Sequence, residues 1–362
     1  MKTNPGTERN GSGLVSEKIK QRLHGLSCPV GKQTMISVVA LKKYFPVVSG
    51  IRSLFSRSRG KYVKAVDSVS FEIPSGKVLG LVGESGCGKT TTGRILVGLD
   101  QATSGDVFIN GESGQELRKK DLKGFYRKAQ MIFQDPYGSI NPQHNVARII
   151  SKPLWYQGVR DRAAIRRKTL ETLELVGLSP PEDFLEKYPH LLSGGQRQRL
   201  CIGRAIILDP QFLVADEPIS MLDVSIKAGI IALLKKLIRH KSLSLLYITH
   251  DLATVGHICD RVAIMYLGKI VEIGPAGTVL DHPLHPYTRA LISAIPIPDP
   301  NTHREEIQIA GAIPDPINLP PGCRFAPRCL QAENGCRQEE PGLSPSTADP
   351  EHQVACFRVV DE

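Results

Sequence analysis

The residues with the clearest chemical potential lie between Gly83 and Thr90, where the order is Gly-Glu-Ser-Gly-Cys-Gly-Lys-Thr. This order fits the phosphate-binding pattern G-x-x-x-x-G-K-[ST] at every specified position. The glycines let backbone N–H groups approach an anion closely, and the N-terminus of a following helix favours negative charge. We expect Lys89 to reach the β- and γ-phosphates of a nucleotide, and the Thr90 hydroxyl to ligate Mg²⁺.

The sequence on either side of this loop predicts the strand and the helix that a phosphate site needs. Residues 78–82 form a short apolar run that is typical of a buried parallel strand, and residues 91–97 are typical of a helix start. A glycine-rich turn can match the loop pattern by chance. With these flanks, however, the segment predicts a nucleotide-binding loop between a strand and a helix.

Three other apolar runs end in polar side chains, namely Gln134, the pair Asp216 and Glu217, and His250. In parallel α/β sheets, ligands bind outside the carboxyl ends of the strands. We therefore expect these side chains to converge on the glycine loop. Taken alone, a histidine after a strand is more often a surface or core group, so the prediction depends on the joint occurrence of all three strand ends.

The chemistry of these side chains suits phosphoryl transfer from a Mg²⁺-bound nucleotide. Asp216 would hold the ion through its hydration shell. Glu217 would act as a base or position the water that attacks the γ-phosphate in line. Gln134 would touch the ion and the attacking water, and His250 would clamp the γ-phosphate and the Glu217 side chain. The sequence thus predicts a catalytic site for nucleotide hydrolysis.

A second glycine segment begins with Leu192-Ser193-Gly194-Gly195-Gln196. Ser193 is a good N-cap, and the two glycines free backbone N–H groups at a helix start, so this segment is another candidate anion site. One chain that binds one nucleotide does not need two such sites. We therefore expect a dimer in which this segment closes on the nucleotide held by a second subunit. The alternative is a capped helix after a loop.

Together these motifs resemble the ATPase subunits of ABC transporters over roughly residues 36–280. Residues 192–196 match the signature motif of that family, and Gln134 matches its Q-loop. Residues 220–223 match its D-loop, with Met221 where alanine is usual. His250 matches its switch histidine.

The resemblance implies an α/β fold of the P-loop NTPase type. This fold has a RecA-like parallel sheet core, an antiparallel β subdomain and an inserted helical subdomain at about 136–206. It implies Mg²⁺ contacts from Thr90, Gln134 and Asp216, and catalytic roles for Glu217, His250 and Gln134. An aromatic side chain should stack on adenine, and counting favours Phe45 while Tyr44 stays open. The implied ATP-binding residues are Phe45, Gly83, Glu84, Ser85, Gly86, Cys87, Gly88, Lys89, Thr90, Thr91, Gln134, Ser193, Gly194, Gly195, Gln196, Asp216 and Asp223.

The C-terminal part narrows the resemblance to the oligopeptide/dipeptide importers. The matching segments are 285–291, 294–296, 311–314 and 321–325. The turn Phe45-Pro46-Val47 agrees with the ATPase component that stands second in such operons. Leu330 departs from the proline that is usual after Arg-Cys. We expect a flexible N-terminal extension at 1–35, an ATPase domain at 36–280 and a C-terminal domain of the oligopeptide-transporter type at 281–362.

Four of the eight cysteines crowd this C-terminal part with the spacing C-x5-C-x6-C-x19-C: Cys323, Cys329, Cys336 and Cys356. Zinc sites commonly use closer pairs of cysteines, whereas four thiolates suit an iron–sulfur cluster. In proteins that resemble this chain, the region carries a [4Fe–4S] cluster. We therefore expect such a cluster to staple a proline-rich segment, with zinc or free thiols as the alternative.

The 362 residues carry a net charge of +10, and no run of about eighteen apolar residues predicts a membrane span. The N-terminus lacks the apolar core of a signal peptide, so we expect a protein of the cytoplasm that reaches the membrane through a partner. The net charge admits nucleic acid or anionic lipid, but a scattered solvated surface is the simpler interpretation. The basic loop with Arg52, Arg57, Arg59 and Lys61 has no interleaved aromatic residues, so no nucleic-acid partner is predicted.

The resemblance implies a translocase-type ATPase at the cytoplasmic face of the cell membrane. It would form a heterodimer with a homologous ATPase of different sequence, and it would bind two membrane-spanning permease subunits. An external solute-binding protein would deliver peptides, with nickel or glutathione as alternative solutes. A groove for a cytoplasmic permease helix is expected near Gln134 and residues 136–142. A soluble ABC protein of translation or DNA repair would need two cassettes or a coiled coil, and a small-molecule kinase would have no use for residues 192–196.

Overall fold

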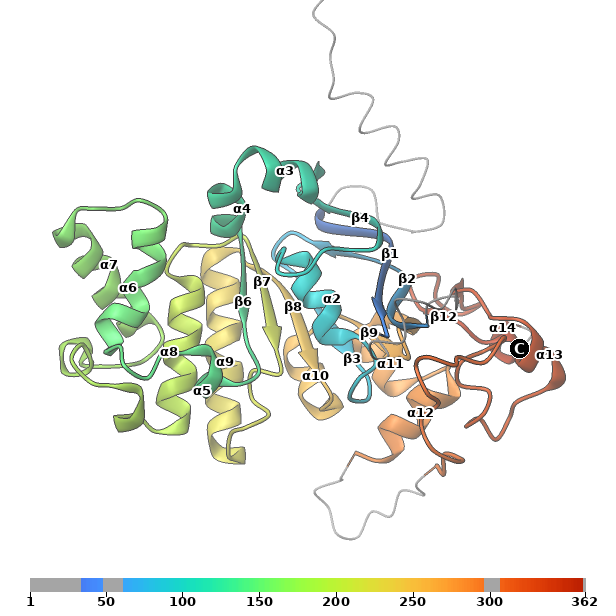
Figure 1. Cartoon of the computed structure of the whole chain (residues 1–362). Coiled ribbons are helices and arrows are strands. Elements are labelled where there is room, and N and C mark those ends of the chain that lie inside the picture. Colours follow the sequence, from blue (N-terminus) through green and yellow to red (C-terminus); the bar gives the residue numbers. More distant parts are fainter. Residues whose placement is uncertain (1–33, 48–60, 296–306, 361–362) are drawn as a thin grey trace, which may run out of the picture.

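The computed structural model describes residues 34–47, 61–295 and 307–360 (Figure 1). The predicted extension at 1–35 therefore lies outside the described residues up to residue 33. The same holds for most of the basic loop, including Arg52, Arg57 and Arg59. Within the described ranges, no helix is both long enough and apolar enough to cross a membrane.

An eight-stranded sheet forms the centre of the molecule, in the order β11-β12-β10-β9-β3-β8-β7-β6. Strands β9, β3, β8, β7 and β6 run parallel, and β10, β12 and β11 extend this array by antiparallel pairing. The strands are β3 (Val78–Val82), β6 (Ala129–Ile132), β7 (Phe212–Asp216), β8 (Ser244–Thr249), β9 (Arg261–Tyr266), β10 (Lys269–Pro275), β11 (Ser344–Pro345) and β12 (Gln353–Val354).

The central strands are mainly apolar because both faces of the sheet are covered. Every residue of β3, β7 and β8 is buried. On β8, Leu245 and Tyr247 pack into a core shared with the helices, whereas Leu246 and Ile248 pack into the opposite core. The strands predicted from short apolar runs are thus confirmed, and their continuous hydrophobicity reflects burial on two sides.

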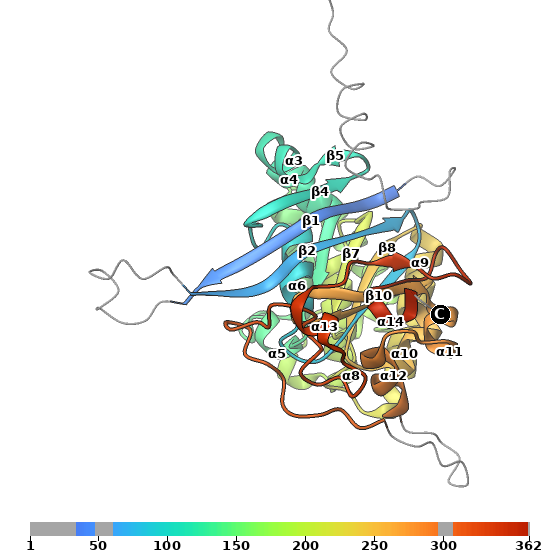
Figure 2. The same cartoon turned by 90° about the vertical axis from the view of Figure 1, so that its right-hand side faces the viewer.

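A second, antiparallel sheet of four strands has the order β2-β1-β4-β5 (Figure 2). Its long strands correspond to the alternating segments around residues 37–41 and 64–73 of the sequence. The Asn110-Gly111 turn between β4 and β5 has positive φ at both residues, as a tight hairpin requires. The strands are β1 (Thr34–Pro46), β2 (Tyr62–Pro74), β4 (Ser104–Ile109) and β5 (Glu112–Ser113).

Helices α6, α7 and α8 gather at one end of the sheet, on the left in Figure 1, within the predicted helical part at 136–206. The Asp161 side chain caps α7, which ends just before Gly177 at φ 74°. The helices are α2 (Lys89–Leu96), α3 (Gly114–Lys120), α4 (Leu122–Lys128), α5 (Pro136–Ser139), α6 (Val146–Tyr156), α7 (Arg162–Leu175), η2 (Pro181–Phe184), η3 (Pro189–Leu191), α8 (Gly194–Ile206), α9 (Val224–Lys241), α10 (Leu252–Ile258), α11 (Ala276–Asp281), α12 (Pro286–Ser293), α13 (Asn334–Gln338) and α14 (Phe357–Val360).

The C-terminal residues join the central sheet through β12, which pairs with β10 at Glu272 and Ile273. The buried rings of Tyr266, Tyr287 and Phe325 form a shared apolar cluster beneath this part of the chain. Backbone pairing and aromatic packing therefore connect the segment beyond residue 281 to the sheet.

Candidate functional site

The glycine loop connects β3 to α2, as the sequence predicts. A Cβ atom at Gly88 would lie 2.0 Å from the carbonyl oxygen of Ala65, and its φ is 109°, so only glycine fits there. Gly88 stands at the N-cap of α2 and offers no side-chain cap. The first N–H groups of α2 are thus left for an anion. Ser85, Gly86 and Thr90 are exposed at this end of the loop.

Lys89 is folded over the loop and is only 5% exposed. Its Nζ donates hydrogen bonds to the carbonyl oxygens of Gly83 and Glu84, at 2.7 and 2.9 Å. It also lies 3.7 Å from the Cys87 thiol. The loop therefore encloses a positive charge that is hydrogen-bonded to neutral carbonyl groups, and this charge favours an anionic ligand.

Asp216 ends β7 beside the loop, where its Oδ1 accepts a hydrogen bond from the Thr90 hydroxyl at 3.1 Å. Burial raises the pKa of Asp216 to about 6, and the neighbouring Glu217 carboxylate adds to the increase. A buried carboxylate next to a hydroxyl is an oxygen-ligand pair of the kind that Mg²⁺ uses together with substrate phosphates. The pair fits the ion predicted for this position.

The raised pKa of Asp216 predicts a pH-dependent stability in the absence of Mg²⁺ and nucleotide. Because the pKa lies above the ordinary value of 3.8, the stability linked to the protonated carboxyl is complete below about pH 4 and is lost as the pH rises through about 6. The substitution Asp216→Asn should flatten this decrease in the free energy of unfolding, measured by urea titration across that range. Asp183→Asn, at an exposed position, is the control. Equal pH slopes for Asp216→Asn and the natural chain would exclude Asp216 as the titrating group.

Glu217 lies between two of the other predicted side chains. Its Oε2 accepts a hydrogen bond from Gln134 Nε2 at 3.0 Å, and its Oε1 lies 3.0 Å from His250 Nδ1. Its backbone has φ 45°, in the left-handed region that non-glycine residues seldom adopt. The strand ends after β6, β7 and β8 thus converge, and the strained backbone of Glu217 is a feature that the sequence did not indicate.

The two candidate aromatic residues for adenine lie next to each other at the end of β1. Phe45 is partly exposed, with Lys43 Nζ 4.8 Å from its ring centre. The Tyr44 hydroxyl donates a hydrogen bond of 2.5 Å to Asp67, and burial raises the pKa of Tyr44 to about 12. The Tyr44 side chain is held in place by its hydrogen bond to Asp67, whereas the Phe45 ring makes no such bond. Phe45 is therefore the better candidate for stacking on adenine.

The second glycine segment forms the predicted helix start. Ser193 Oγ accepts a hydrogen bond from the Gln196 N–H at 3.2 Å, and the Gln196 side chain accepts one from the Ser193 N–H at 3.0 Å. This reciprocal pair is a capping box. Helix α8, which this segment starts, and helix α2, which follows the glycine loop, lie on opposite sides of β6 in Figure 1. Asp223, at the N-cap of α9, makes no side-chain capping bond.

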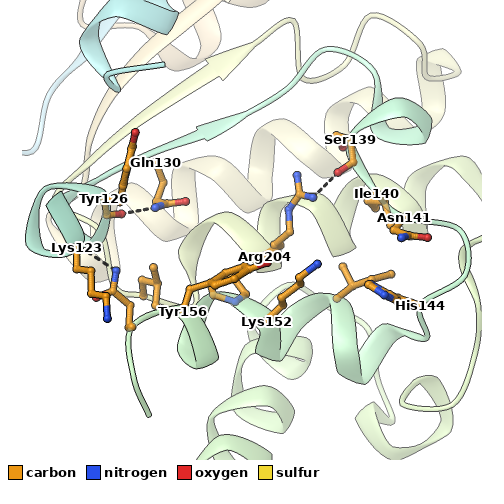
Figure 3. A pocket seen from close by; sticks show the side chains of 14 residues that line it. Lys123, Tyr126, Gln130, Ser139, Ile140, Asn141, His144, Lys152, Tyr156 and Arg204 are labelled. Atoms are coloured by element: carbon orange, nitrogen blue, oxygen red, sulfur yellow. Dashed lines mark hydrogen bonds between the residues drawn. The ribbon is translucent and has the colours of Figure 1, made fainter. Parts of the chain in front are cut away.

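A groove that is separate from this site opens between the sheet and the helical part (Figure 3). It has a volume of about 630 Å³, and residues 139–141 lie in its wall, within the range where the sequence predicts a groove. Arg204 of α8 reaches across and donates to the carbonyl oxygen of Ser139. Lys123, Tyr126, Gln130, Lys152 and Tyr156 complete much of the lining. Gln134, which the sequence placed near this groove, does not line it.

The prediction of a [4Fe–4S] cluster is wrong. All four C-terminal cysteines belong to the described residues, and within those residues no group of three or more His, Cys, Asp or Glu side chains is arranged to hold a metal ion. The thiols are free and face a largely apolar cavity of about 20 Å³ beside Phe325. Burial raises the pKa of the Cys323 thiol to about 11. Apolar packing around Phe325, in place of the expected iron–sulfur cluster, holds this segment. The cysteines concerned are Cys323, Cys329, Cys336 and Cys356.

Comparison with protein families gives two matches along the chain. The model described as "ABC transporter" matches residues 66–220, which include the glycine loop, Gln134, Ser193 and Glu217. The model described as "Oligopeptide/dipeptide transporter, C-terminal region" matches residues 271–336. The two families of the predicted resemblance are thus both found in this chain.

Individual relatives are similar in sequence to this chain over most of their own length. The putative oligopeptide transport ATP-binding protein YkfD of Bacillus subtilis is 48% identical over 312 residues, which are 85% of this chain and 94% of that protein. The dipeptide transport ATP-binding protein DppF of Haemophilus influenzae is 42% identical over 325 residues, which are 90% and 97% of the two chains.

Solved structures show the same fold. The ATP-binding cassette MJ0796, as a dimer in a post-hydrolysis state with ADP and phosphate, gives a TM-score of 0.58 at 26% identity. The match covers 67% of this chain and 99% of that one. The α/β fold of P-loop ATPases is therefore confirmed. The chain belongs to the ABC transporter family, whose ATPases bind ATP with Mg²⁺, among the ATP-binding proteins with an oligopeptide/dipeptide transporter C-terminal region.

Proposed function

We propose that this chain is the ATP-hydrolysing subunit of an importer that moves peptides across the cytoplasmic membrane. The observation that carries the proposal is the convergence of Gln134, Glu217 and His250 beside the Thr90–Asp216 pair. Relatives named as dipeptide and oligopeptide transport proteins support a peptide as the solute. Nickel or glutathione would use the same motor, with selectivity supplied by other subunits.

The nucleotide would lie over the glycine loop, with its phosphates on the N–H groups of α2 and against Lys89. Thr90, Asp216 and Gln134 would hold Mg²⁺. Glu217 would take a proton from the attacking water, since its carboxylate is fixed from both sides by Gln134 and His250. Phe45 would cover the adenine. The remaining residues that the sequence assigned to the loop, from Gly83 to Thr91, would supply backbone contacts.

Hydrolysis would require two chains. Ser193, Gly194 and Gly195 stand at the capped N-terminus of α8 and would close on a nucleotide held by a homologous subunit. Gln196 and Asp223 would contribute to the same interface. Met221 and Val224, beside Asp223, are strongly exposed apolar residues that such an interface would cover. The solved cassette MJ0796 is a dimer, which supports this arrangement. We propose a heterodimer, as the sequence resemblance implies.

The other partners would be two permease subunits and an external solute-binding protein, which place this chain at the cytoplasmic face of the membrane. The groove in Figure 3 suits a short amphipathic helix of a permease, because it combines apolar side chains with the cations of Lys123, Lys152 and Arg204. We also propose the domain division at 36–280 and 281–362. The antiparallel sheet, the parallel strands and the helical part would then form the ATPase domain, and residues 281–362 would form a C-terminal domain of the oligopeptide-transporter type.

Co-purification tests this function. The full chain, expressed with the products of its neighbouring genes, should capture two membrane proteins from detergent extracts. Tyr156→Ala should reduce the capture by about tenfold or more, because an exposed aromatic in a groove is a typical hot spot. Trp155→Ala is the matched control, since the adjacent Trp155 lines a different cavity of the same helix. ATP-dependent peptide uptake by the reconstituted complex completes the test. Capture of no membrane protein would contradict the proposed function. Equal capture by Tyr156→Ala and the natural chain would contradict the assignment of the groove to a permease helix.

A further inference from the structure

A buried arginine of the C-terminal region forms an ion pair with a residue of the phosphate-binding loop. Arg328 is 8% exposed, and its two terminal nitrogens donate to the two carboxylate oxygens of Glu84, at 2.8 and 3.1 Å. Arg328 also lies 3.4 Å from the Tyr266 hydroxyl. Glu84 belongs to the glycine loop, 244 residues away in the sequence. This paired geometry is the strongest form of arginine–carboxylate contact, because it fixes both orientation and distance.

The backbone of Glu84 is held from the same side. Its N–H donates a hydrogen bond of 2.9 Å to the hydroxyl of Tyr287, which stands on α12. The Tyr287 ring is itself fixed, with its centre 4.8 Å from that of Tyr266 and 5.4 Å from that of Phe325. Glu84 is thus bound through both its side chain and its main chain by Arg328 and Tyr287, which follow the ATPase domain proposed at 36–280.

Glu84 connects these contacts to the lysine of the loop. Its carbonyl oxygen accepts a hydrogen bond from Lys89 Nζ at 2.9 Å. Arg328 and Tyr287 therefore limit the movement of the segment that orients Lys89. A loop held in one shape binds phosphate more tightly than a loop that must first be ordered, because less conformational entropy is lost on binding.

A second arginine of the same region reaches the other end of the nucleotide site. The guanidinium of Arg324 is buried against the Asp67 carboxylate of β2 and also donates to the carbonyl oxygen of Leu267. Asp67 accepts the hydrogen bond of the Tyr44 hydroxyl, and Tyr44 precedes Phe45 on β1. In Figure 2 the C-terminal region, in red, lies below β1 and β2.

We propose that the C-terminal region is a positioning element of the nucleotide site. Arg328 and Tyr287 fix the phosphate-binding loop through Glu84. Arg324 fixes, through Asp67 and Tyr44, the strand end that carries the candidate adenine-stacking ring. These are positioning residues, since each acts through another residue. The inference rests on the nucleotide site proposed above and adds a defined route by which the C-terminal region controls nucleotide affinity.

The burial of the two charges in the Glu84 pair is unequal. The Arg328 side chain is 9% exposed, whereas that of Glu84 is 24% exposed and can regain water. Glu84→Gln leaves a buried guanidinium without its counter-charge, so it should lower folding stability more than Arg328→Gln does. Arg328→Gln removes the buried charge itself and is therefore the better variant for binding measurements.

The test uses the full chain with two probes, Mg-ATP and inorganic tripolyphosphate with Mg²⁺, in equilibrium titrations. Arg328→Gln and Tyr287→Phe should each weaken the binding of both probes by about fivefold to tenfold, which is the lower end of the usual coupling between two sites. Arg328→Lys should recover part of the affinity, because an ammonium can still pair with Glu84. Arg324→Gln should weaken ATP alone, since tripolyphosphate has no adenine. Tyr287→Phe keeps its ring and serves as the deciding variant if Arg328→Gln does not fold.

Arg358→Gln is the matched control, because Arg358 also belongs to the C-terminal region but pairs with Glu333 of that same region, at 3.0 Å. It should bind both probes as the natural chain does. Wild-type affinity of folded Arg328→Gln and Tyr287→Phe would overturn the inference. A loss confined to ATP in these two variants, or an equal loss in Arg358→Gln, would overturn it as well. A natural chain that binds neither probe would instead overturn the proposed nucleotide site, and this inference with it.

Discussion

Glu217→Gln is expected to lower ATP turnover by a factor of about 10² to 10⁴, while nucleotide binding persists. Removing a general base usually costs this much, because the attacking water is no longer relieved of its proton. Glutamine has nearly the same shape as glutamate. Its amide oxygen can still accept from Gln134 Nε2, and its amide nitrogen can donate to His250 Nδ1, so both 3.0 Å contacts can be kept. The change therefore affects the chemistry more than the geometry.

The same substitution should also trap the dimer. If closure on ATP joins the Gly194–Gly195 helix start of one chain to the loop of another, slow hydrolysis leaves the closed form populated. Size-exclusion chromatography with Mg-ATP should then show a stable dimer for Glu217→Gln, alone or with the partner ATPase, and ADP should not support it. Phosphate-release assays measure the turnover.

Glu171→Gln is the matched control for both measurements, because Glu171 is an exposed carboxylate on α7, outside the strand ends. It should retain the turnover of the natural chain. Normal hydrolysis by Glu217→Gln would remove Glu217 from its proposed role. A monomer in the presence of ATP would leave the hydrolytic role intact and contradict the shared site.

Lys89→Ala is expected to weaken Mg-ATP binding by about a hundredfold or more. Lys89 is enclosed in the loop, where its charge faces carbonyl oxygens and no carboxylate contacts it among the interactions of the described residues. Deleting one partner of a buried charge pair typically costs 2–5 kcal/mol, and the phosphates would be that partner in the bound state. The free protein should not lose stability in proportion, because a buried charge is removed along with its contacts.

Isothermal titration with Mg-ATP measures this loss, and thermal unfolding without nucleotide shows whether the fold is kept. Lys77→Ala is the control. Lys77 forms a more exposed ion pair with Asp260 at 2.6 Å, and such surface pairs contribute little to the free energy of folding. The affinity of Lys77→Ala should match that of the natural chain. Binding by Lys89→Ala within threefold of the natural affinity would contradict a phosphate site at this loop.

The sequence determined the local elements of this protein because each motif carries its own structural requirement. The G-x-x-x-x-G-K-T order requires glycine where Gly88 has φ 109° and a Cβ would meet a carbonyl oxygen. Ser193 followed by Gln196 predicts a capping box, and the structure contains one. The polar residues after apolar runs converge because parallel strands place their carboxyl ends on one edge of the sheet.

Only the tertiary structure decided how the C-terminal residues pack among themselves and against the phosphate-binding loop. The four cysteines have a spacing that suits a cluster, yet packing around Phe325 leaves their thiols at a small apolar cavity. The pairing of Arg328 with Glu84 has no signal in either segment, since it depends on how α12 and the following loop lie against β3 and β9. Spacing along a chain constrains residues that share one element, whereas contacts between elements are set by the burial of side chains from all of them.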